Sequence, residues 1–351
     1  MADLLLGSEV ALAKAFDLAL VDLDGVAYMG HEPIPYASFG LGSARDLGMQ
    51  LVFVTNNASR EPQDVADQLT GLDIPTRADE VMTAAQACAR SLADHVAPGA
   101  KVLVVGGAGL ITAVTEAGYQ VVQSADDNPA AVAQGFHPSL GWAQLAEAAY
   151  AVRNGAIHVA SNLDKSLPTD RGFAPGNGSL VLAVQSATGV EPFSAGKPSP
   201  NMYRMAVANT TATNPLVIGD RLDTDLAGAR SGGYPGLHVL TGVNSARDDI
   251  LAPASMRPHF IGADLRSLLE PHEQPVLRDG WWTCGDASVR VDGTALEISS
   301  RTYADGIDSL SQAQELDIVR AACNAAWSHV DQGLELDPSS VPHLLDTGAQ
   351  A

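Results

Sequence analysis

Short apolar runs without polar alternation recur along this chain of 351 residues, and polar residues follow each of them at once. The clearest runs are residues 18–21, 51–54 and 215–218. Such runs are typical of parallel strands covered on both faces, and helical patterns fill the stretches between them. This rhythm predicts an α/β fold with a doubly wound parallel sheet. Ligands of such sheets bind at the carboxyl ends of the strands, so the polar residues there are candidates for chemistry.

The rhythm is interrupted once and then resumes. Between residues 83 and 193 a second α/β pattern has its own strand candidates at 101–105, 131–133 and 157–160. The first pattern returns with the run at 215–218. We therefore predict a parent sheet formed by residues 1–82 and 194–270, with an inserted α/β domain over residues 83–193.

The pattern changes again in residues 271–351. A hairpin is predicted from strands at 281–291 and 295–299 around Asp292-Gly293, and an amphipathic helix is predicted over 316–330. These elements supply too little core for an independent unit. We expect this small α+β extension to dock on the body of the protein or on a partner chain.

Composition excludes several classes of partner. The net charge of -21 repels nucleic-acid phosphates and anionic lipid, and no apolar run approaches the roughly 18 residues of a membrane span. The three cysteines form no disulfide or zinc pattern, and Asp3 lies where a secretory signal requires basic residues. We expect a cytoplasmic protein that binds neither nucleic acid nor membrane.

Asp22 and Asp24 lie on the loop that leaves the first predicted strand. In a helix-loop-helix calcium motif aligned on Gly25, the first and twelfth positions hold an oxygen ligand and a glutamate. Here they are Leu20 and His31, so the calcium interpretation fails. An ordinary Asp- and Gly-rich surface turn stays open for this string alone.

Three further polar groups follow strand or helix boundaries: Thr55-Asn56-Asn57, Lys197-Pro198, and the segment from Asp220 to Asp225. In order and residue type, these groups and the Asp22/Asp24 pair resemble the four motifs of the haloacid dehalogenase superfamily of phosphotransferases. The resemblance covers roughly residues 14–270. It implies that Asp22 attacks phosphorus and forms an aspartyl-phosphate, while Asp24 acts as general acid and base.

The resemblance also implies a metal site. Mg²⁺ is the expected ion because the available ligands are hard oxygens. Its ligands would be the Asp22 carboxylate, the Asp24 backbone carbonyl and Asp220, with Asp225 binding directly or through water. Asp223 is interpreted as a helix cap.

The phosphate would be held by the two remaining motifs. Thr55 and the backbone amides of Asn56 and Asn57 would bind phosphoryl oxygens. Lys197 would bind the phosphate and reduce the repulsion between the catalytic carboxylates.

The size of the insertion indicates the substrate class. Within the superfamily, a large α/β insertion between the second and third motifs marks a C2-type cap, as in the NagD-like and p-nitrophenyl phosphatase group. Such a cap admits small phosphorylated metabolites. Asn162, Asp164 and the segment 176–178 are candidates for substrate selection, with turn or capping roles equally open.

Length, cap and acidic tail are most similar to bacterial glycerol 3-phosphate phosphatases, so hydrolysis of glycerol 3-phosphate to glycerol and phosphate is the leading hypothesis. Pyridoxal phosphate, sugar phosphates and nucleoside monophosphates stay open as substrates. A sensing or assembly module is the alternative from another class, although no motif residue has been lost. We also keep open a homodimer formed through the insertion or the extension.

Overall fold

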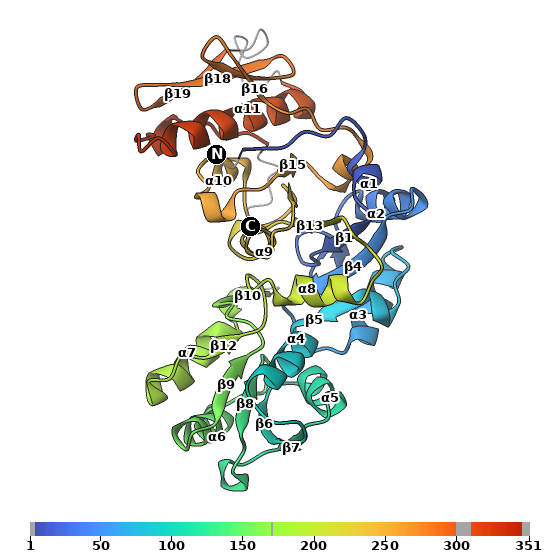
Figure 1. The fold of residues 1–351 in the computed structure, drawn as a ribbon, viewed down its shortest axis with the longest axis vertical. Coiled ribbons are helices and arrows are strands. Elements are labelled where there is room, and N and C mark those ends of the chain that lie inside the picture. The colour runs from blue at the N-terminus through green and yellow to red at the C-terminus, as the bar shows by residue number, and fades with distance from the viewer. Residues whose placement is uncertain (1–3, 170, 300–309, 346–351) are drawn as a thin grey trace. The chain divides into compact units, whose positions relative to one another are not determined.

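The computed structural model describes residues 4–169, 171–299 and 310–345. It divides into two compact units, the first formed by Met1–Leu51 with Ala212–Ala351 and the second by Val52–Thr211 (Figure 1). The parts of the predicted extension at 300–309 and 346–351 lie outside the described residues. None of the described helices is both long and apolar enough to cross a membrane.

The first unit is built on a parallel sheet. Its strands follow the order β15-β14-β13-β1, and β4 begins beside β1, where the Gln50 amide donates to the Asp17 carbonyl at 2.9 Å. All four residues of β1 are buried, as expected for a strand covered on both faces. The prediction of a parallel core sheet is confirmed. The strands are β1 (Leu18–Val21), β4 (Gln50–Thr55), β13 (Pro215–Gly219), β14 (Gly236–Val239) and β15 (Phe260–Gly262).

Short helices and turns connect these strands. After β13 the chain forms a π-helical segment, η4, followed by a short α-helix, α9. The connecting elements are α1 (Leu12–Ala15), the β2 (Tyr28–Met29) and β3 (Glu32–Pro33) pair, α2 (Ala37–Asp46), η4 (Leu222–Leu226), α9 (Ala227–Gly232), α10 (Ala246–Ile250), η5 (Ala254–Met256) and η6 (Leu265–Leu269).

The C-terminal extension is an antiparallel four-stranded sheet with one long helix against it (Figure 1). The single strand predicted over 281–291 is two strands, because the chain turns at Gly285 with a φ of +52°. Buried Trp327 lies in one apolar cluster with Leu5, Ile250 and Ile261, so the extension packs onto the body of the first unit. Its elements are β16 (Val276–Arg278), β17 (Trp281–Cys284), β18 (Ala287–Asp292), β19 (Ala295–Ser299), α11 (Gln312–Val330) and η9 (Pro338–Ser340).

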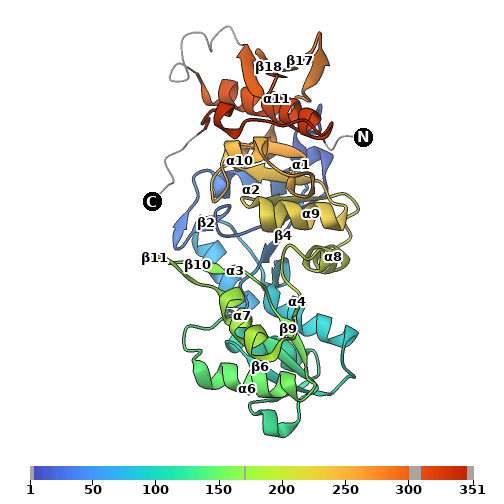
Figure 2. The ribbon, with the colours of Figure 1, turned by 90° about the vertical axis from the view of Figure 1, so that its left-hand side faces the viewer.

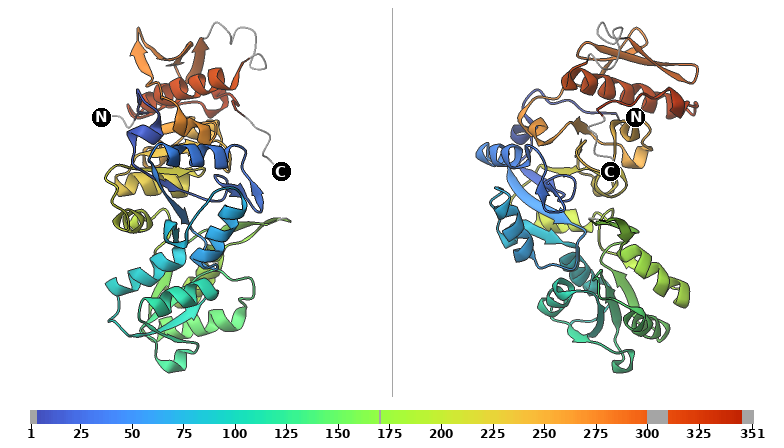
Figure 3. Two further views of the ribbon diagram at one scale, coloured as in Figure 1. Left: turned by 90° about the vertical axis from the view of Figure 1, so that its right-hand side faces the viewer. Right: turned by 180° about the vertical axis from the view of Figure 1, so that it is seen from behind.

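The second unit contains the end of β4, which pairs in parallel with β5, and a separate parallel sheet of order β12-β9-β8-β6-β7. Helices α6 and α7 lie on one side of the separate sheet and α4 and α5 on the other (Figure 3). The second parallel sheet predicted for the insertion is confirmed. Its strands are β5 (Val81–Thr83), β6 (Lys101–Val105), β7 (Gln120–Val122), β8 (Ala131–Gln134), β9 (Ile157–Ala160) and β12 (Phe193–Ser194).

Helices alternate with the strands of the second unit, and Pro62 lies in the first turn of α3. An antiparallel hairpin of β10 (Ser166–Thr169) and β11 (Gly172–Pro175) was not predicted; it projects from its unit in Figure 2. The helices are α3 (Pro62–Gly71), η1 (Ala78–Glu80), α4 (Ala84–Ser91), η2 (Leu92–Asp94), α5 (Ala108–Glu116), η3 (Ala125–Asp127), α6 (Trp142–Arg153), α7 (Asn177–Thr188) and α8 (Asn201–Ala208).

Candidate active site

Three carboxylates meet at the carboxyl ends of β1 and β13. Asp22 follows β1 directly, and its amide donates to the Ile218 carbonyl of β13 at 2.9 Å. Asp220 follows β13, and Asp225 lies one turn further on in η4. Asp22, Asp220 and Asp225 are buried, and each offers an oxygen within 4.8 Å of the others. Parallel strands that end at one edge of the sheet therefore bring together acids that are about 200 residues apart in the sequence.

Backbone groups and two glycines enclose the Asp220 carboxylate. Its Oδ2 accepts a hydrogen bond of 2.7 Å from the Val243 amide, while its Oδ1 is buried without a hydrogen-bond partner among the described residues. A Cβ added to Gly25 would lie 2.4 Å from Oδ2, and Gly25 has a φ of +82° that favours glycine. A Cβ added to Gly242 would lie 2.0 Å from the same oxygen. The orphaned oxygen is placed among carboxylates where a cation would satisfy it.

Burial raises the pKa of Asp220 to about 8, with repulsion from Asp22 and Asp225 adding to the shift and the Val243 hydrogen bond opposing it. Buried carboxylates this close together are unfavourable in the ionised state without a counter-charge. A divalent cation supplies that charge, and hard carboxylate oxygens are the ligands that Mg²⁺ prefers. The donor set therefore fits a magnesium ion.

Asp225 is held in place by its own loop. Its Oδ2 accepts from the Arg221 amide at 3.3 Å, and its amide donates to the Arg221 carbonyl at 3.0 Å. A Cβ on Gly219 would lie 2.2 Å from the Asp225 Cβ, so the end of β13 must be glycine for Asp225 to pack there. The exposed Asp223 instead forms an ion pair with Arg221 at 2.9 Å.

Asp24 lies outside the three-carboxylate cluster. It is exposed, and its backbone forms an isolated bridge with Tyr28. The Gly25 amide donates to the Tyr28 carbonyl at 2.8 Å, which closes the turn after Asp24. The loop thus separates two roles: a buried acid at position 22 and a solvent-facing acid at position 24.

In the second unit, the Asn56 side chain connects three segments. Its Nδ2 donates to both Asp164 carboxylate oxygens at 3.2 and 3.0 Å and to the Lys197 carbonyl at 3.3 Å. Its Oδ1 accepts from the Lys197 amide at 2.9 Å. The second and third predicted motifs are therefore held together by one amide group, and the loop after β9 is joined to them.

Lys197 and Thr55 are buried at the end of β4. The Lys197 Nζ donates to the Val54 carbonyl at 3.2 Å, and the Thr55 hydroxyl accepts from the Asn57 amide at 3.1 Å. Asn57 itself is exposed. Lys197 is 3% exposed, and a buried ammonium group must be matched by an anion or by hydrogen bonds.

Asn162 and Asp164 are the candidates for substrate selection, and both are engaged in contacts within the protein. Asn162 Nδ2 donates to the Asn56 carbonyl at 2.7 Å, and Asn177 Nδ2 donates to the Asn162 carbonyl at 2.8 Å. A Cβ on Gly178 would lie 2.2 Å from the Leu163 carbonyl oxygen. The segment 176–178 therefore fixes the loop that carries Asn162 and Asp164.

Sequence reasoning missed a buried pair behind Asp220. His238 on β14 places Nε2 3.1 Å from the Asp220 carbonyl oxygen and Nδ1 2.7 Å from Asp249 Oδ2. Burial opposes a charge on the imidazole, but Asp249 and the Asp220 carbonyl together raise the pKa of His238. The histidine within the apolar run at 237–240 is the signal that the sequence offered for this pair.

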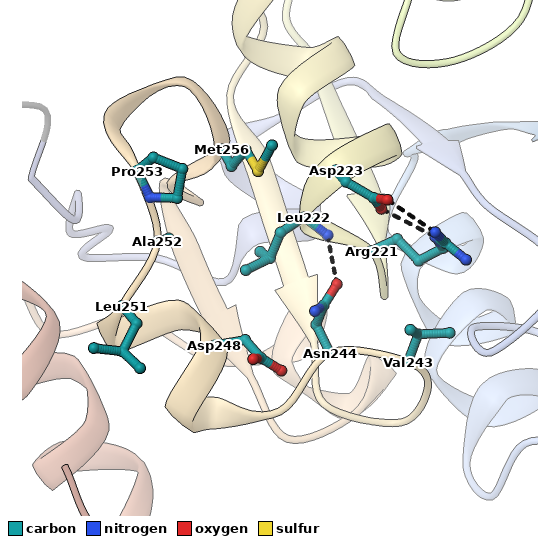
Figure 4. Close-up of a pocket in the computed structure, with 10 residues that line it drawn as sticks. All are labelled: Arg221, Leu222, Asp223, Val243, Asn244, Asp248, Leu251, Ala252, Pro253 and Met256. Carbon is teal, nitrogen blue, oxygen red and sulfur yellow. Dashed lines mark hydrogen bonds and ion pairs between the residues drawn. The ribbon is translucent and has the colours of Figure 1, made fainter. Parts of the chain in front are cut away.

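A surface pocket of about 330 Å³ lies beside the Asp220 loop (Figure 4). Asn244 Oδ1 accepts from the Leu222 amide at 2.9 Å in its wall, and the Arg221–Asp223 ion pair forms one rim. Apolar side chains of Leu251, Pro253 and Met256 form the opposite rim. The pocket is separate from the carboxylate cluster, since none of the three acids lines it.

Comparison with known proteins assigns the family. Residues 19–120 match the model of haloacid dehalogenase-like hydrolases, and residues 194–268 match a second model of the same hydrolase type. The chain is 42% identical over 319 residues to D-glycerol 3-phosphate phosphatase of Mycobacterium tuberculosis, covering 90% of this chain and 87% of that protein. The chain belongs to the haloacid dehalogenase-like hydrolases. Acid sugar phosphatase of Staphylococcus saprophyticus is 34% identical and covers 74% of this chain and all of that protein.

Solved structures of such hydrolases agree. A crystal structure of the glycerol phosphate phosphatase of M. tuberculosis in complex with magnesium matches with a TM-score of 0.82 and 41% identity, covering 91% of this chain and 92% of that one. The p-nitrophenyl phosphatase of Archaeoglobus fulgidus matches with a TM-score of 0.67 and 28% identity, covering 72% and 98%. The resemblance to the p-nitrophenyl phosphatase group is confirmed. Residues 284–341 match a model of a GCN5-related N-acetyltransferase-like domain.

Proposed function

We propose that this hydrolase is a magnesium-dependent phosphatase that converts glycerol 3-phosphate to glycerol and phosphate. The observation that carries the proposal is the buried cluster of Asp22, Asp220 and Asp225 with its orphaned oxygen, in a chain 42% identical to a glycerol 3-phosphate phosphatase. Asp22, Asp220, Asp225 and the Asp24 carbonyl are assigned as ligands. When bound, Mg²⁺ neutralises charge around the phosphoryl group.

We assign the chemical steps to the two acids of the first loop. A carboxylate oxygen of Asp22 attacks phosphorus in line, and the bond between phosphorus and the ester oxygen breaks. Asp24 gives its proton to the leaving glycerol oxygen. It then takes a proton from the water that hydrolyses the aspartyl-phosphate, which returns both acids to their starting states and releases phosphate.

The phosphate-binding groups are assigned to the second unit. Thr55, the amides of Asn56 and Asn57, and the Lys197 ammonium group donate hydrogen bonds to phosphoryl oxygens. The Asn56 side chain forms hydrogen bonds with both the amide and the carbonyl of Lys197. These bonds support the assignment, because they fix the backbone that carries the ammonium group. Asn162 and Asp164 are assigned to substrate selection, and residues 83–193 to a C2-type cap on a core of residues 1–82 and 194–270.

The decisive experiment is phosphate release from a panel of phosphate esters by the purified protein with Mg²⁺. We expect the highest kcat/KM for glycerol 3-phosphate, above glucosamine phosphate, pyridoxal phosphate and UMP. A flat ranking contradicts the substrate assignment, and a sugar phosphate at the top favours the activity named for the staphylococcal relative.

The nucleophile is tested separately. Asp22→Asn keeps the size of the side chain but removes its nucleophilic charge, so we expect turnover and the covalent phosphoenzyme to disappear while circular dichroism stays unchanged. Full activity of this variant rules out the mechanism. It would also favour the sensing role that was the alternative class of function.

Two further predictions accompany the proposal. The three cysteines are free and buried, which supports the expected reducing, cytoplasmic location. A homodimer through the insertion or the extension stays a prediction, and light scattering of the purified protein tests it.

A further inference from the structure

A line of buried hydrogen bonds runs from the long helix α11 to the main chain of Asp220. The Trp327 Nε1 of α11 donates to the Asp249 carbonyl at 3.0 Å. Asp249 Oδ2 lies 2.7 Å from His238 Nδ1, and His238 Nε2 lies 3.1 Å from the Asp220 carbonyl oxygen. The helix α11 and two elements that lie close together in sequence, β14 and α10, are thereby connected to the loop that carries the central carboxylate.

The direction of the bond to Asp220 is fixed by chemistry. A carbonyl oxygen only accepts, so the proton must be on His238 Nε2, whichever group carries the proton between Nδ1 and Asp249. The same carbonyl also accepts from the Asn244 amide at 3.1 Å, and the carboxylate of that residue accepts from the Val243 amide. The main chain and the side chain of Asp220 are therefore oriented by separate donors.

The His238–Asp249 pair occupies a position where stability alone does not require polar side chains. His238 and Asp249 are wholly buried, and apolar residues Leu240, Ala246 and Ile250 beside them belong to the cluster that joins the extension to the sheet. Apolar side chains of similar volume commonly stabilise such a position as well as, or better than, a buried ion pair does. What an apolar residue at 238 lacks is the donor that fixes the Asp220 backbone.

We propose that His238 and Asp249 are positioning residues for the Asp220 carboxylate, and that Trp327 extends this support to the C-terminal extension. The inference rests on the proposed function, because it takes Asp220 as a metal ligand. It gives the extension a role in the phosphatase site. Trp327 of α11 holds α10, Asp249 of α10 orients His238, and His238 fixes the loop that carries Asp220. Supporting groups behind a metal ligand typically change metal affinity about 10- to 100-fold when they are removed.

Two substitutions at position 238 separate positioning from packing. In His238→Gln the side-chain amide can reach the place of Nε2 and donate to the Asp220 carbonyl. In His238→Asn the shorter amide takes the place of Nδ1, keeps Asp249 and loses Asp220. We expect the Mg²⁺ concentration for half-maximal activity to rise about 10- to 100-fold in His238→Asn and to rise clearly less in His238→Gln.

Trp327→Phe tests the contribution of the extension. It keeps an aromatic ring in the core and removes the Nε1 donor. Asn324→Ala is the matched control, because it removes one buried hydrogen bond from the same helix, the 3.0 Å bond from the Leu5 amide, and does not contact the chain of bonds to Asp220. We expect a weaker response to Mg²⁺ in Trp327→Phe and an unchanged response in Asn324→Ala at comparable loss of thermal stability.

Hydrogen exchange of the metal-free protein gives a readout independent of activity. The amides of Val243 and Asn244 bond to Asp220, so we expect peptides covering 219–226 and 241–246 to exchange faster in His238→Asn and Trp327→Phe than in wild type and Asn324→Ala. Equal exchange and equal Mg²⁺ requirements in all four proteins overturn the inference. If the wild-type protein itself releases no phosphate with Mg²⁺, the proposed function fails first, while the exchange result still decides whether the bonds hold the loop.

Discussion

Gly242 and Asp220 approach so closely that no side chain fits between them: a Cβ on Gly242 would lie 2.0 Å from Asp220 Oδ2. The neighbouring amide of Val243 donates to the same oxygen. A loop without a side chain at position 242 is therefore a condition for the carboxylate to face Asp22 and Asp225. The geometry of the cluster depends on glycine as much as on the acids.

Gly242→Ala is expected to displace the Asp220 carboxylate and abolish Mg²⁺-dependent phosphate release, with a loss of about 1–3 kcal/mol in the free energy of unfolding. Gly42→Ala on α2 is the matched control, since a Cβ there meets nothing within 4 Å. Urea unfolding and a phosphate assay of both variants give the comparison. Retained activity in Gly242→Ala shows that the close contact does not determine the site.

The contribution of Asp220 to the stability of the metal-free protein is expected to fall as pH rises. The pKa of Asp220 is raised to about 8 in the folded state, whereas the unfolded residue titrates near 3.8. Between these values the folded state binds the additional proton, so stability decreases with increasing pH. Thermal unfolding in EDTA from pH 5 to 8.5 measures the slope, and Asp220→Asn removes its source. We expect added Mg²⁺ to stabilise most at the alkaline end, and a slope unchanged by the substitution contradicts this account.

His272 predicts a second pH effect, of opposite sign. Burial and the Arg320 guanidinium lower the pKa of His272 to about 4. Arg320 can only donate, so Nδ1 accepts from it at 3.3 Å, and Nε2 donates to the Ser267 carbonyl at 2.8 Å. The unfolded state binds the proton first, and stability is lost as pH falls from about 6.5 to about 4, by about 3 kcal/mol.

Urea unfolding between pH 7 and 4 measures this loss, with His272→Gln as the comparison. Glutamine keeps a donor for the Ser267 carbonyl and has no proton to gain, so the loss should shrink. His158, whose pKa burial also lowers to about 4, keeps part of the dependence. An identical pH profile in the variant excludes His272 as the source.

Substitution of Asp24 is expected to lower the rate of catalysis and to leave the stability of the fold unchanged. Because Asp24 is exposed and outside the buried cluster, Asp24→Asn should leave the melting temperature unchanged. Loss of general acid and base assistance should lower kcat by about 10²- to 10⁴-fold. A substrate with a good leaving group, such as p-nitrophenyl phosphate, should lose less in the first step, and equal losses for both esters would argue against protonation of the alcohol by this residue.

Asn56 is expected to hold the groups of the proposed phosphate site in position. Asn56→Ala removes the hydrogen bonds to the Asp164 carboxylate and to the amide and carbonyl of Lys197. We expect kcat/KM to fall by about 10- to 100-fold, because a displacement of binding groups by about 1 Å can have an effect of this size. Asp126→Ala, at an exposed carboxylate of the same unit, is the control. Steady-state kinetics with the best phosphate ester measure the difference, and wild-type values for Asn56→Ala would contradict the role.

The sequence supported these predictions unevenly. Uniform apolar runs such as residues 18–21 are typical of parallel strands covered on both faces, and their alternation with helical stretches allowed the two parallel sheets to be predicted from pattern alone. Strand ends then predicted where Asp22 and Asp220 would lie. The chemistry of the site could be predicted because both the type and the position of these residues are constrained.

Other features depend on contacts that a linear pattern does not contain. The β10–β11 hairpin has exposed residues and little apolar alternation, so pattern gave no signal for it. Gly242 looks like any turn glycine until the Asp220 carboxylate is seen against it. His238 is one polar residue in an apolar strand, and its partners Asp249 and Asp220 become evident only when β13, β14 and α10 are packed together.

The helix α11 also determines which of the two units can fold first during synthesis. The Leu5 amide donates to Asn324 Oδ1, and the core that surrounds this bond takes residues from both ends of the chain. The second unit, Val52–Thr211, is continuous and leaves the ribosome whole. The first unit has to wait, because Leu5 and the other body residues of this cluster lack part of their core until α11 has been translated.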